Sequence, residues 1–432
     1  MPEVAFGVIF HWLGGLASGS FYVPYKAVKK WSWEVYWLAG GFFSWIIAPL
    51  VMGTLLTQEL WPTISQGFAE APGAMRWAFL FGMLWGIGGL TFGLTMRYLG
   101  MSLGMAVALG LCTVLGTVMP DIFKGTIISN IQTQPPYVVI LLGLGVCLLG
   151  VILAGIAGMS KEREMPDDVK KESIKEFNFV KGISVALISG LFSACMAFGL
   201  QAAEPIAEIS MAHGTEKLWS GLPKLVVVLW GGFTTNFIWC MFLLLKNKTL
   251  YQFFTTTIKD PDAPGRTVKV NWIWNLFFSA LAGTTWYFQF FFYSMGETKM
   301  GEYRFSSWTL HMASIIIFSS LWGLALNEWK GASKFTKFIL GVGIFTLIYS
   351  TIVVGYGNLM KQEGGEANAQ EVSATLDPEG VETATNAIED AATKAADAVD
   401  AAATEIKDAA IEAVQPNAGA KANEEAAPAV AP

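Results

Sequence analysis

The sequence predicts an all-α integral membrane protein with ten transmembrane helices in two inverted five-helix repeats, followed by a flexible Ala/Glu-rich C-terminal tail. Three observations predict this fold class. Only 14% of the 432 residues are charged and 53% are hydrophobic, against about 25% charged residues in soluble domains. Long apolar runs recur along the first 358 residues. The last 72 residues hold 15 Asp or Glu and 4 Lys, a balance of −11, which leaves +5 on the preceding 360 residues of a chain with net charge −6.

Ten apolar runs are long enough to cross a membrane. A bilayer core about 30 Å thick requires about 20 residues at 1.5 Å of rise each. The runs with this length and few charges are 5–27, 35–57, 75–96, 101–120, 136–159, 179–201, 222–245, 272–295, 305–326 and 336–358. The first run is expected to be a span and not a cleaved signal peptide, because no basic region precedes it and no small-residue cleavage site lies before Pro24.

Lysine and arginine in the connecting segments predict the orientation. The odd-numbered loops hold 18 Lys or Arg, whereas the N-terminus, the even-numbered loops and Lys361 hold 7. Basic loops are retained in the cytoplasm. Both termini are therefore expected outside the cytoplasmic membrane, which is the periplasm if the cell is a Gram-negative bacterium. Arg97 ends the third run and is expected to anchor it at the cytoplasmic surface.

The span count predicts two halves. Residues 1–160 form the first five-helix half, 161–178 a cytoplasmic linker, 179–358 the second half, and 359–432 a low-complexity acidic tail that is partly helical at most. An odd number of spans per half inverts the second half in the membrane. LTMRYLGMSLG at 94–104 also resembles FFYSMGETKMG at 291–301.

Two histidines lie inside predicted spans. His11 and His311 come from different halves, each about six residues, or roughly 9 Å, below the outer boundary. Histidine titrates near neutral pH, so the pair is a candidate proton-coupling site. The alternative is that each is a neutral, hydrogen-bonded packing residue.

Aromatic and polar residues gather in the eighth and ninth spans. Trp286, Gln289 and Tyr293 share one helical stripe, and Trp308 lies close to His311 in the sequence. Tryptophan faces suit the C–H face of a sugar, and an amide exchanges hydrogen bonds with hydroxyls. The alternative is ordinary interfacial or core packing.

Motifs for other classes of protein are missing from the sequence. It has no Walker A loop, no GxGxxG after a strand, no HExxH and no nucleophile elbow. The four cysteines lie in apolar runs without metal or disulfide spacing. No catalytic residue, metal, cofactor or nucleic-acid partner is therefore expected.

Several long motifs resemble one family. HWLGGLASGSFYVPYKAVKKWSWE at 11–34, GLTMRYLGMSLG at 93–104, WYFQFFFYSMG at 286–296, SWTLHMA at 307–313 and NEWK at 327–330 look like the bacterial L-rhamnose-proton symporter family. The resemblance covers roughly residues 1–358. It implies a ten-helix fold of the drug/metabolite transporter type, two outward-facing termini, and inward sugar transport driven by the proton gradient.

The resemblance is weakest after WGIG, where better-studied members carry asparagines and a tyrosine and this chain has Gly89–Phe92. The hypothesis is therefore proton-coupled uptake of L-rhamnose or a similar deoxy sugar. His11 and His311 are the coupling candidates; the sugar-binding candidates are Trp85, Thr91, Trp286, Gln289 and Trp308. Two alternatives remain: a metabolite exporter of the same superfamily, and a non-transporting membrane receptor or scaffold. The oligomeric state stays open.

The tail combines a Gly/Glu/Asn-rich linker at 361–381 with alanines and β-branched residues at alternating spacings of 4 and 3. Because alanine seams bury little area, a lone, fraying helix is expected here. The resemblance ends before this segment. The tail is therefore predicted to be dispensable for transport: truncation after Met360 should leave sugar uptake intact at equal membrane levels.

Overall fold

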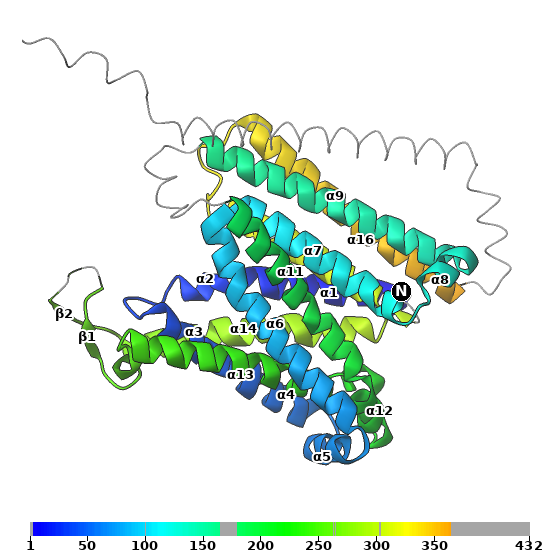
Figure 1. Cartoon of the computed structure of the whole chain (residues 1–432), viewed down its shortest axis with the longest axis horizontal. Helices are drawn as coiled ribbons and strands as arrows, with labels where there is room; N and C mark the ends of the chain where they lie inside the picture. The colour runs from blue at the N-terminus through cyan, green and yellow to red at the C-terminus, as the bar shows by residue number, and fades with distance from the viewer. Residues whose placement is uncertain are drawn as a thin grey trace, which may run out of the picture. The chain divides into compact units, whose positions relative to one another are not determined.

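Each range predicted to span the membrane is largely helical in the computed structural model, which describes residues 3–99, 101–164, 179–261, 263, 265–301 and 304–363 (Figure 1). The described residues belong to one unit, Met1–Gly365, and the predicted tail lies almost wholly outside them. The helices are α1 (Glu3–Ser20) with α2 (Tyr22–Tyr25), α3 (Trp33–Phe42) with η1 (Phe43–Ile47) and α4 (Ala48–Leu56), α6 (Pro72–Leu99), α7 (Met101–Phe123), α9 (Pro135–Glu164), α11 (Phe179–Ala202), α13 (Leu222–Lys246), α14 (Trp272–Glu297), α15 (Ser306–Ala325) and α16 (Lys334–Glu363).

Short elements connect the long helices. They are α5 (Leu60–Glu70), α8 (Ile127–Thr133), α12 (Glu204–Ala212), η2 (Lys217–Trp219), η3 (Leu250–Phe253), β1 (Thr257–Lys259) and β2 (Thr267–Lys269). The two strands pair antiparallel, with Ile258 opposite Val268. This hairpin of two three-residue strands is a small departure from a purely helical chain, and it lies in a connecting loop.

By length and apolar composition, seven helical segments of the described chain can cross a membrane. The number is eight if the bent pair Val107–Phe123 and Ile127–Thr133, which meet at 93°, forms one span. Neither α6 nor α14 is among them, although they hold 28 and 26 residues. The tryptophan, tyrosine, hydroxyl and amide side chains of α14 lower its mean hydropathy. The structure therefore supports an all-α membrane protein and leaves the tenfold crossing as a prediction.

The second helical run contains a π-helical turn. Pro49 has no N–H to donate to the carbonyl of Trp45, one turn earlier. The turn at η1 (Phe43–Ile47) accordingly adopts π geometry between α3 and α4. Such turns are frequent at functional sites because they change the direction of side chains. Here the turn carries Ser44 and Trp45 into the protein interior, where both are buried.

Helices distant in sequence pack together. α6 packs against α11 and α13, whereas α14 packs against α1 and α3. α9 and α16 lie side by side along their length (Figure 1). The largest apolar cluster draws its buried residues mainly from α6, α11, α13 and α14, and Trp45 from the π-helical turn joins it.

The connecting loops form two separate rims. At the basic rim, Lys26 pairs with Glu328 at 3.1 Å, Lys30 pairs with Asp260 at 2.7 Å, and Thr249 donates to Glu34 at 2.7 Å. These residues all belong to odd-numbered loops or their helix ends. At the N-terminal rim, Glu3 pairs with Lys299 at 2.8 Å, and Thr63 lies 2.9 Å from the His213 ring. In these pairs, odd-numbered loops contact odd-numbered loops, and the N-terminus and even-numbered loops contact one another. This pattern is expected of a chain that crosses the membrane repeatedly, because alternate loops then lie on the same side.

Candidate functional site

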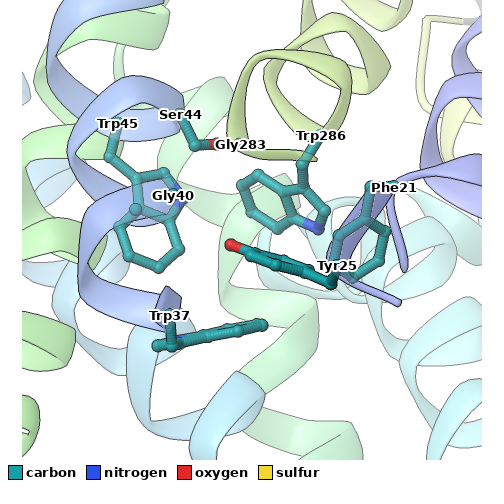
Figure 2. A pocket seen from close by; sticks show the side chains of 9 residues that line it. Phe21, Tyr25, Trp37, Gly40, Ser44, Trp45, Gly283 and Trp286 are labelled. Atoms are coloured by element: carbon teal, nitrogen blue, oxygen red, sulfur yellow. The ribbon is translucent and has the colours of Figure 1, made fainter. Parts of the chain in front are cut away.

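A pocket lies where α1–α2, the α3–η1 run and α14 meet (Figure 2). Its cavity volume is about 10 Å³, room for about one water molecule, and the non-atom space including the open mouth is about 210 Å³. Its lining residues are Phe21, Tyr25, Trp37, Gly40, Gly41, Ser44, Trp45, Gly283 and Trp286. Of the predicted sugar-binding residues, Trp286 lines this pocket directly.

Trp45 and Trp286 line the pocket, and Trp85, which does not line it, contacts both of them. Trp85 from α6 stacks on Trp286 from α14, with ring centroids 5.3 Å apart and an angle of 28° between the rings. Trp45 stands edge-on to both rings, 6.4 Å from Trp85 and 5.6 Å from Trp286. Two candidates that lie some 200 residues apart in the sequence are thus in contact. The flat rings present the apolar surface that the C–H face of a sugar requires.

Polar atoms without partners line the same pocket. The Ser44 hydroxyl and the Trp45 indole N–H are buried and have no hydrogen-bond partner within the described chain. Trp37 at the pocket's edge donates its indole N–H to the Asn236 side-chain oxygen at 3.1 Å. Buried polar groups are normally paired. A water molecule or a ligand hydroxyl supplies the partner that each of these two atoms lacks.

Close backbone contact between α3 and α14 shapes the pocket. A Cβ atom at Gly283 would lie 1.9 Å from the Gly40 carbonyl oxygen, and one at Gly40 would lie 1.9 Å from the Tyr25 hydroxyl. Neither distance is possible for a real side chain. The Tyr25 hydroxyl occupies the space that Gly40 leaves open, and Figure 2 shows it turned toward Trp45.

The two predicted proton-coupling residues lie next to each other. His11 on α1 and His311 on α15 are fully buried, with ring centroids 6.5 Å apart. Tyr293 on α14 lies 5.3 Å from each of them. None of the four imidazole nitrogens has a hydrogen-bond partner among the residues that the structure describes. Both rings are packed against the Tyr293 ring.

Phe290 joins the tryptophan pocket to the histidine pair. Its ring lies 5.2 Å from Trp286, 5.6 Å from Trp85 and 6.1 Å from His311. Trp308 lies on the histidine side, 6.2 Å from His311, and donates its indole N–H to the Cys112 carbonyl at 3.1 Å. The two sites therefore share one wall of aromatic rings.

Two further candidates differ in their surroundings. Gln289 is buried on α14, and its amide nitrogen has no partner within the described residues. Thr91 donates its hydroxyl to the Ile87 and Gly88 carbonyls of its own helix, at 2.9 and 3.1 Å. Six residues at 100° each place Thr91 about 120° around α6 from Trp85. The structure therefore does not bring Thr91 to the tryptophan wall.

Several residues at the site have no sequence signal that singles them out. Trp45, Ser44 and Asn236 each lie within an apolar run. Only the π-helical turn and the neighbouring helices reveal their place at the pocket. Lys224 is different, because it lies inside the predicted span 222–245 and is 1% exposed. A lysine within a span is itself a signal of function.

Known proteins resemble this chain over nearly the whole of its described length. The family model described as L-rhamnose-proton symport protein (RhaT) matches residues 2–360. A protein named L-rhamnose-proton symporter from Salmonella typhi is 38% identical over 355 residues, which cover 82% of this chain and 98% of that protein. The protein of the same name from Yersinia pestis (strain Pestoides F) matches with the same identity and coverage. The chain therefore belongs to the L-rhamnose-proton symport protein family.

Proposed function

We propose that this protein carries L-rhamnose or a closely related deoxy sugar inward across the bacterial inner membrane together with a proton, by alternating access. The observation that carries the proposal is the shared aromatic wall. On one side of Phe290 lies a pocket with unpaired polar atoms, and on the other side lie two buried imidazoles. The curated relatives named L-rhamnose-proton symporter support the same substrate and the same coupling ion.

The sugar occupies the tryptophan pocket in this proposal. A deoxy sugar has a methyl group and C–H faces that suit the Trp85–Trp286 stack. Its hydroxyls complete the hydrogen bonding of Ser44 and the Trp45 indole. Gln289 and Trp308 contribute from the histidine side. Thr91 belongs to the proposal through its place on α6 alone and is the candidate with the least structural support.

The proton binds at the histidine pair. Imidazole exchanges a proton near neutral pH and has one nitrogen to donate and one to accept. His11 and His311 come from helices in different halves of the chain. Phe290 contacts both His311 and Trp286. In this proposal, protonation of the histidine pair shifts Phe290 and thereby changes the shape of the sugar pocket.

The helix packing supports the inverted repeat. We propose that ten segments cross the membrane and that α1 corresponds to α11, α3–α4 to α13, α6 to α14, α7 to α15 and α9 to α16. The main packing pairs exchange under this correspondence. α6 packs on α11 as α14 packs on α1, and α7 packs on α11 as α15 packs on α1. α13 packs on α6 as α3 packs on α14. The linker predicted at 161–178 separates the two halves in this proposal, and α9 continues to Glu164.

The two rims support the proposed orientation. The basic rim carries most of the Lys and Arg of the loops and faces the cytoplasm in this proposal. The N-terminal rim then faces the periplasm, and both chain termini with it.

Uptake of labelled sugar tests the proposal. In cells without a rhamnose transporter of their own, expression of this chain should give saturable uptake of labelled L-rhamnose that a protonophore abolishes. Fucose and lyxose serve as competitors that define the sugar. Sugar efflux in place of uptake would support the exporter alternative, and no saturable transport in either direction would support a receptor or scaffold.

A further inference from the structure

Four charged side chains form a cluster at the N-terminal rim, which we call the rim ion cluster. Lys224 on α13 places its ammonium nitrogen 2.8 Å from a Glu204 oxygen and 2.8 Å from a Glu297 oxygen. Arg304, just before α15, pairs with the other oxygen of Glu204. Lys224 is 1% exposed and Glu297 is 9% exposed. The two cations balance the two carboxylates, so the cluster is neutral as a whole.

The cluster ends a line of contacts between the start of α13 and the end of α14. Trp219 stacks on Phe291 at 5.8 Å. A Cβ atom at Gly221 would lie 2.1 Å from the Ser294 hydroxyl, so the glycine lets this side chain approach the start of α13 closely. Lys224 then bonds Glu297. The three contacts follow the same order in both segments. Together they hold the start of α13 against the end of α14, and we call this set of contacts the closure.

The closure adjoins the unpaired polar groups of the proton site. Tyr293 precedes Ser294 in α14 and contacts both His11 and His311. The Ser294 hydroxyl and the imidazole nitrogens lack partners within the described chain. Groups of this kind bind water when water reaches them. The closure is thus positioned to control whether they reach the solution at the N-terminal rim.

Few other contacts hold these two helix ends together. α13 packs mainly on α6 and α3, and α14 packs mainly on α1 and α3. Buried ion pairs lose about as much hydration free energy as they gain in attraction. A closure built from ions can therefore open at little net cost, because water solvates the separated charges. Apolar side chains in the same place would gain no hydration free energy on separation, so opening them would cost more.

We propose that Lys224 is the latch of a gate at the N-terminal rim, which separates α13 from α14 when the proton site opens to the periplasm. This inference rests on the proposed alternating access. Lys224 and Glu297 are positioning residues: they touch neither sugar nor proton site and act by setting how often the gate opens.

Cysteine labelling tests the latch. Ser294→Cys places a thiol at the closure with little change in size, and the four native cysteines are buried. Whole cells are treated with a membrane-impermeant maleimide, and the rate of labelling reports opening. Adding Lys224→Gln leaves Glu204 and Glu297 facing each other without their shared lysine. Labelling should then accelerate about tenfold, because the two carboxylates are stabilised by water in the open state.

A paired substitution gives the opposite result. Lys224→Met with Glu297→Met removes one cation and one anion and leaves the Glu204–Arg304 pair intact. Because methionine side chains gain nothing from water, labelling should fall below that of the Ser294→Cys parent, and uptake should slow with it. Lys299→Gln is the matched control: Lys299 pairs with the exposed Glu3 at the same rim, so labelling should change by less than about twofold.

The labelling rates decide the proposal. An unchanged labelling rate with Lys224→Gln would overturn the latch. Faster labelling of the paired methionine variant would overturn it as well, because the cluster would then block access by its shape and not by its charges. If Lys224→Gln does not reach the membrane, the labelling rate of the methionine variant relative to its parent decides. Labelling needs no transported sugar, so absence of rhamnose uptake by the unaltered chain refutes the proposed function and leaves the latch to be judged on its own.

Discussion

At the scale of single residues, the sequence singles out candidates for the site where their chemistry is unusual for a membrane span. His11 and His311 stand out in the sequence because each is a titratable group in an apolar run, and the structure places their rings 6.5 Å apart. Trp286 and Trp85 are in contact as well. Trp45 and Ser44 are not predictable, because an aromatic or a serine in an apolar run is common. Their role depends on which helices lie opposite, and one sequence does not show this.

Trp286 should contribute directly to sugar affinity. Trp286→Ala removes one ring of the stack and opens the pocket wall. The KM for sugar should rise at least about tenfold, equivalent to ~1.4 kcal/mol of binding, with a smaller effect on the maximal rate. Concentration-dependent uptake measures both quantities. Trp274→Ala, on the same helix but 51% exposed, is the control and should leave KM unchanged. Equal KM values for the two variants would remove the pocket from the sugar pathway.

The histidine pair should be required for coupling and not for sugar binding. In His11→Gln with His311→Gln, sugar exchange across the membrane should persist, whereas accumulation driven by a pH gradient should be lost, because neither imidazole of the buried pair remains to carry the proton. Counterflow and gradient-driven uptake in proteoliposomes separate these two activities. His213→Gln alters the third histidine, which bonds Thr63 and Gln66 at the N-terminal rim, and should keep full coupling. Proton-coupled accumulation by the double variant would refute the assignment.

At the scale of elements, apolar run length predicts where helices form. It does not predict how they are interrupted. Run 35–57 contains a π-helical turn at Phe43–Ile47, and the loop before α14 contains the β1–β2 hairpin. Both depend on local effects, a missing proline N–H in the first case and three-residue strand pairing in the second. Helix α16 also continues to Glu363, beyond residue 358 where the last predicted run ends. The apolar pattern stops near that residue, whereas the helical backbone hydrogen bonds continue.

The α3–α14 crossing should tolerate no side chain at Gly283. Gly283→Ala places a Cβ against the Gly40 carbonyl, which is backbone and cannot rotate away. The helices must separate, so the variant should lose roughly 1–3 kcal/mol of stability and most of its uptake. Thermal unfolding of the purified protein measures the first effect.

Gly341→Ala in α16 is the control for this substitution, because a Cβ there would meet nothing within 4 Å. It should leave the melting temperature unchanged or slightly higher, since alanine favours helix. Full stability and full uptake in Gly283→Ala would show that the two helices are not held this closely in the membrane.

At the scale of the whole molecule, charge predicts the arrangement of the loops. The count of Lys and Arg separates odd-numbered loops from even-numbered ones, and the structure forms ion pairs within each group: Lys26 with Glu328 at one rim, and Glu3 with Lys299 at the other. The count of Lys and Arg does not predict the burial of Lys224. This lysine is the third residue of the predicted span 222–245, where a basic side chain is usually assigned to the adjoining loop. Its burial between two carboxylates follows from the approach of α12, α13 and α14, which only the folded chain brings about.

The direction of proton movement tests the central claim, that sugar and proton move inward together. L-rhamnose is added to a lightly buffered, anaerobic suspension of cells that express this chain, and the external pH is recorded. The account predicts a transient rise in external pH that is saturable in sugar, disappears with a protonophore, and is absent from the His11→Gln, His311→Gln double variant. Acidification of the medium, or saturable rhamnose uptake without any change in pH, would contradict it.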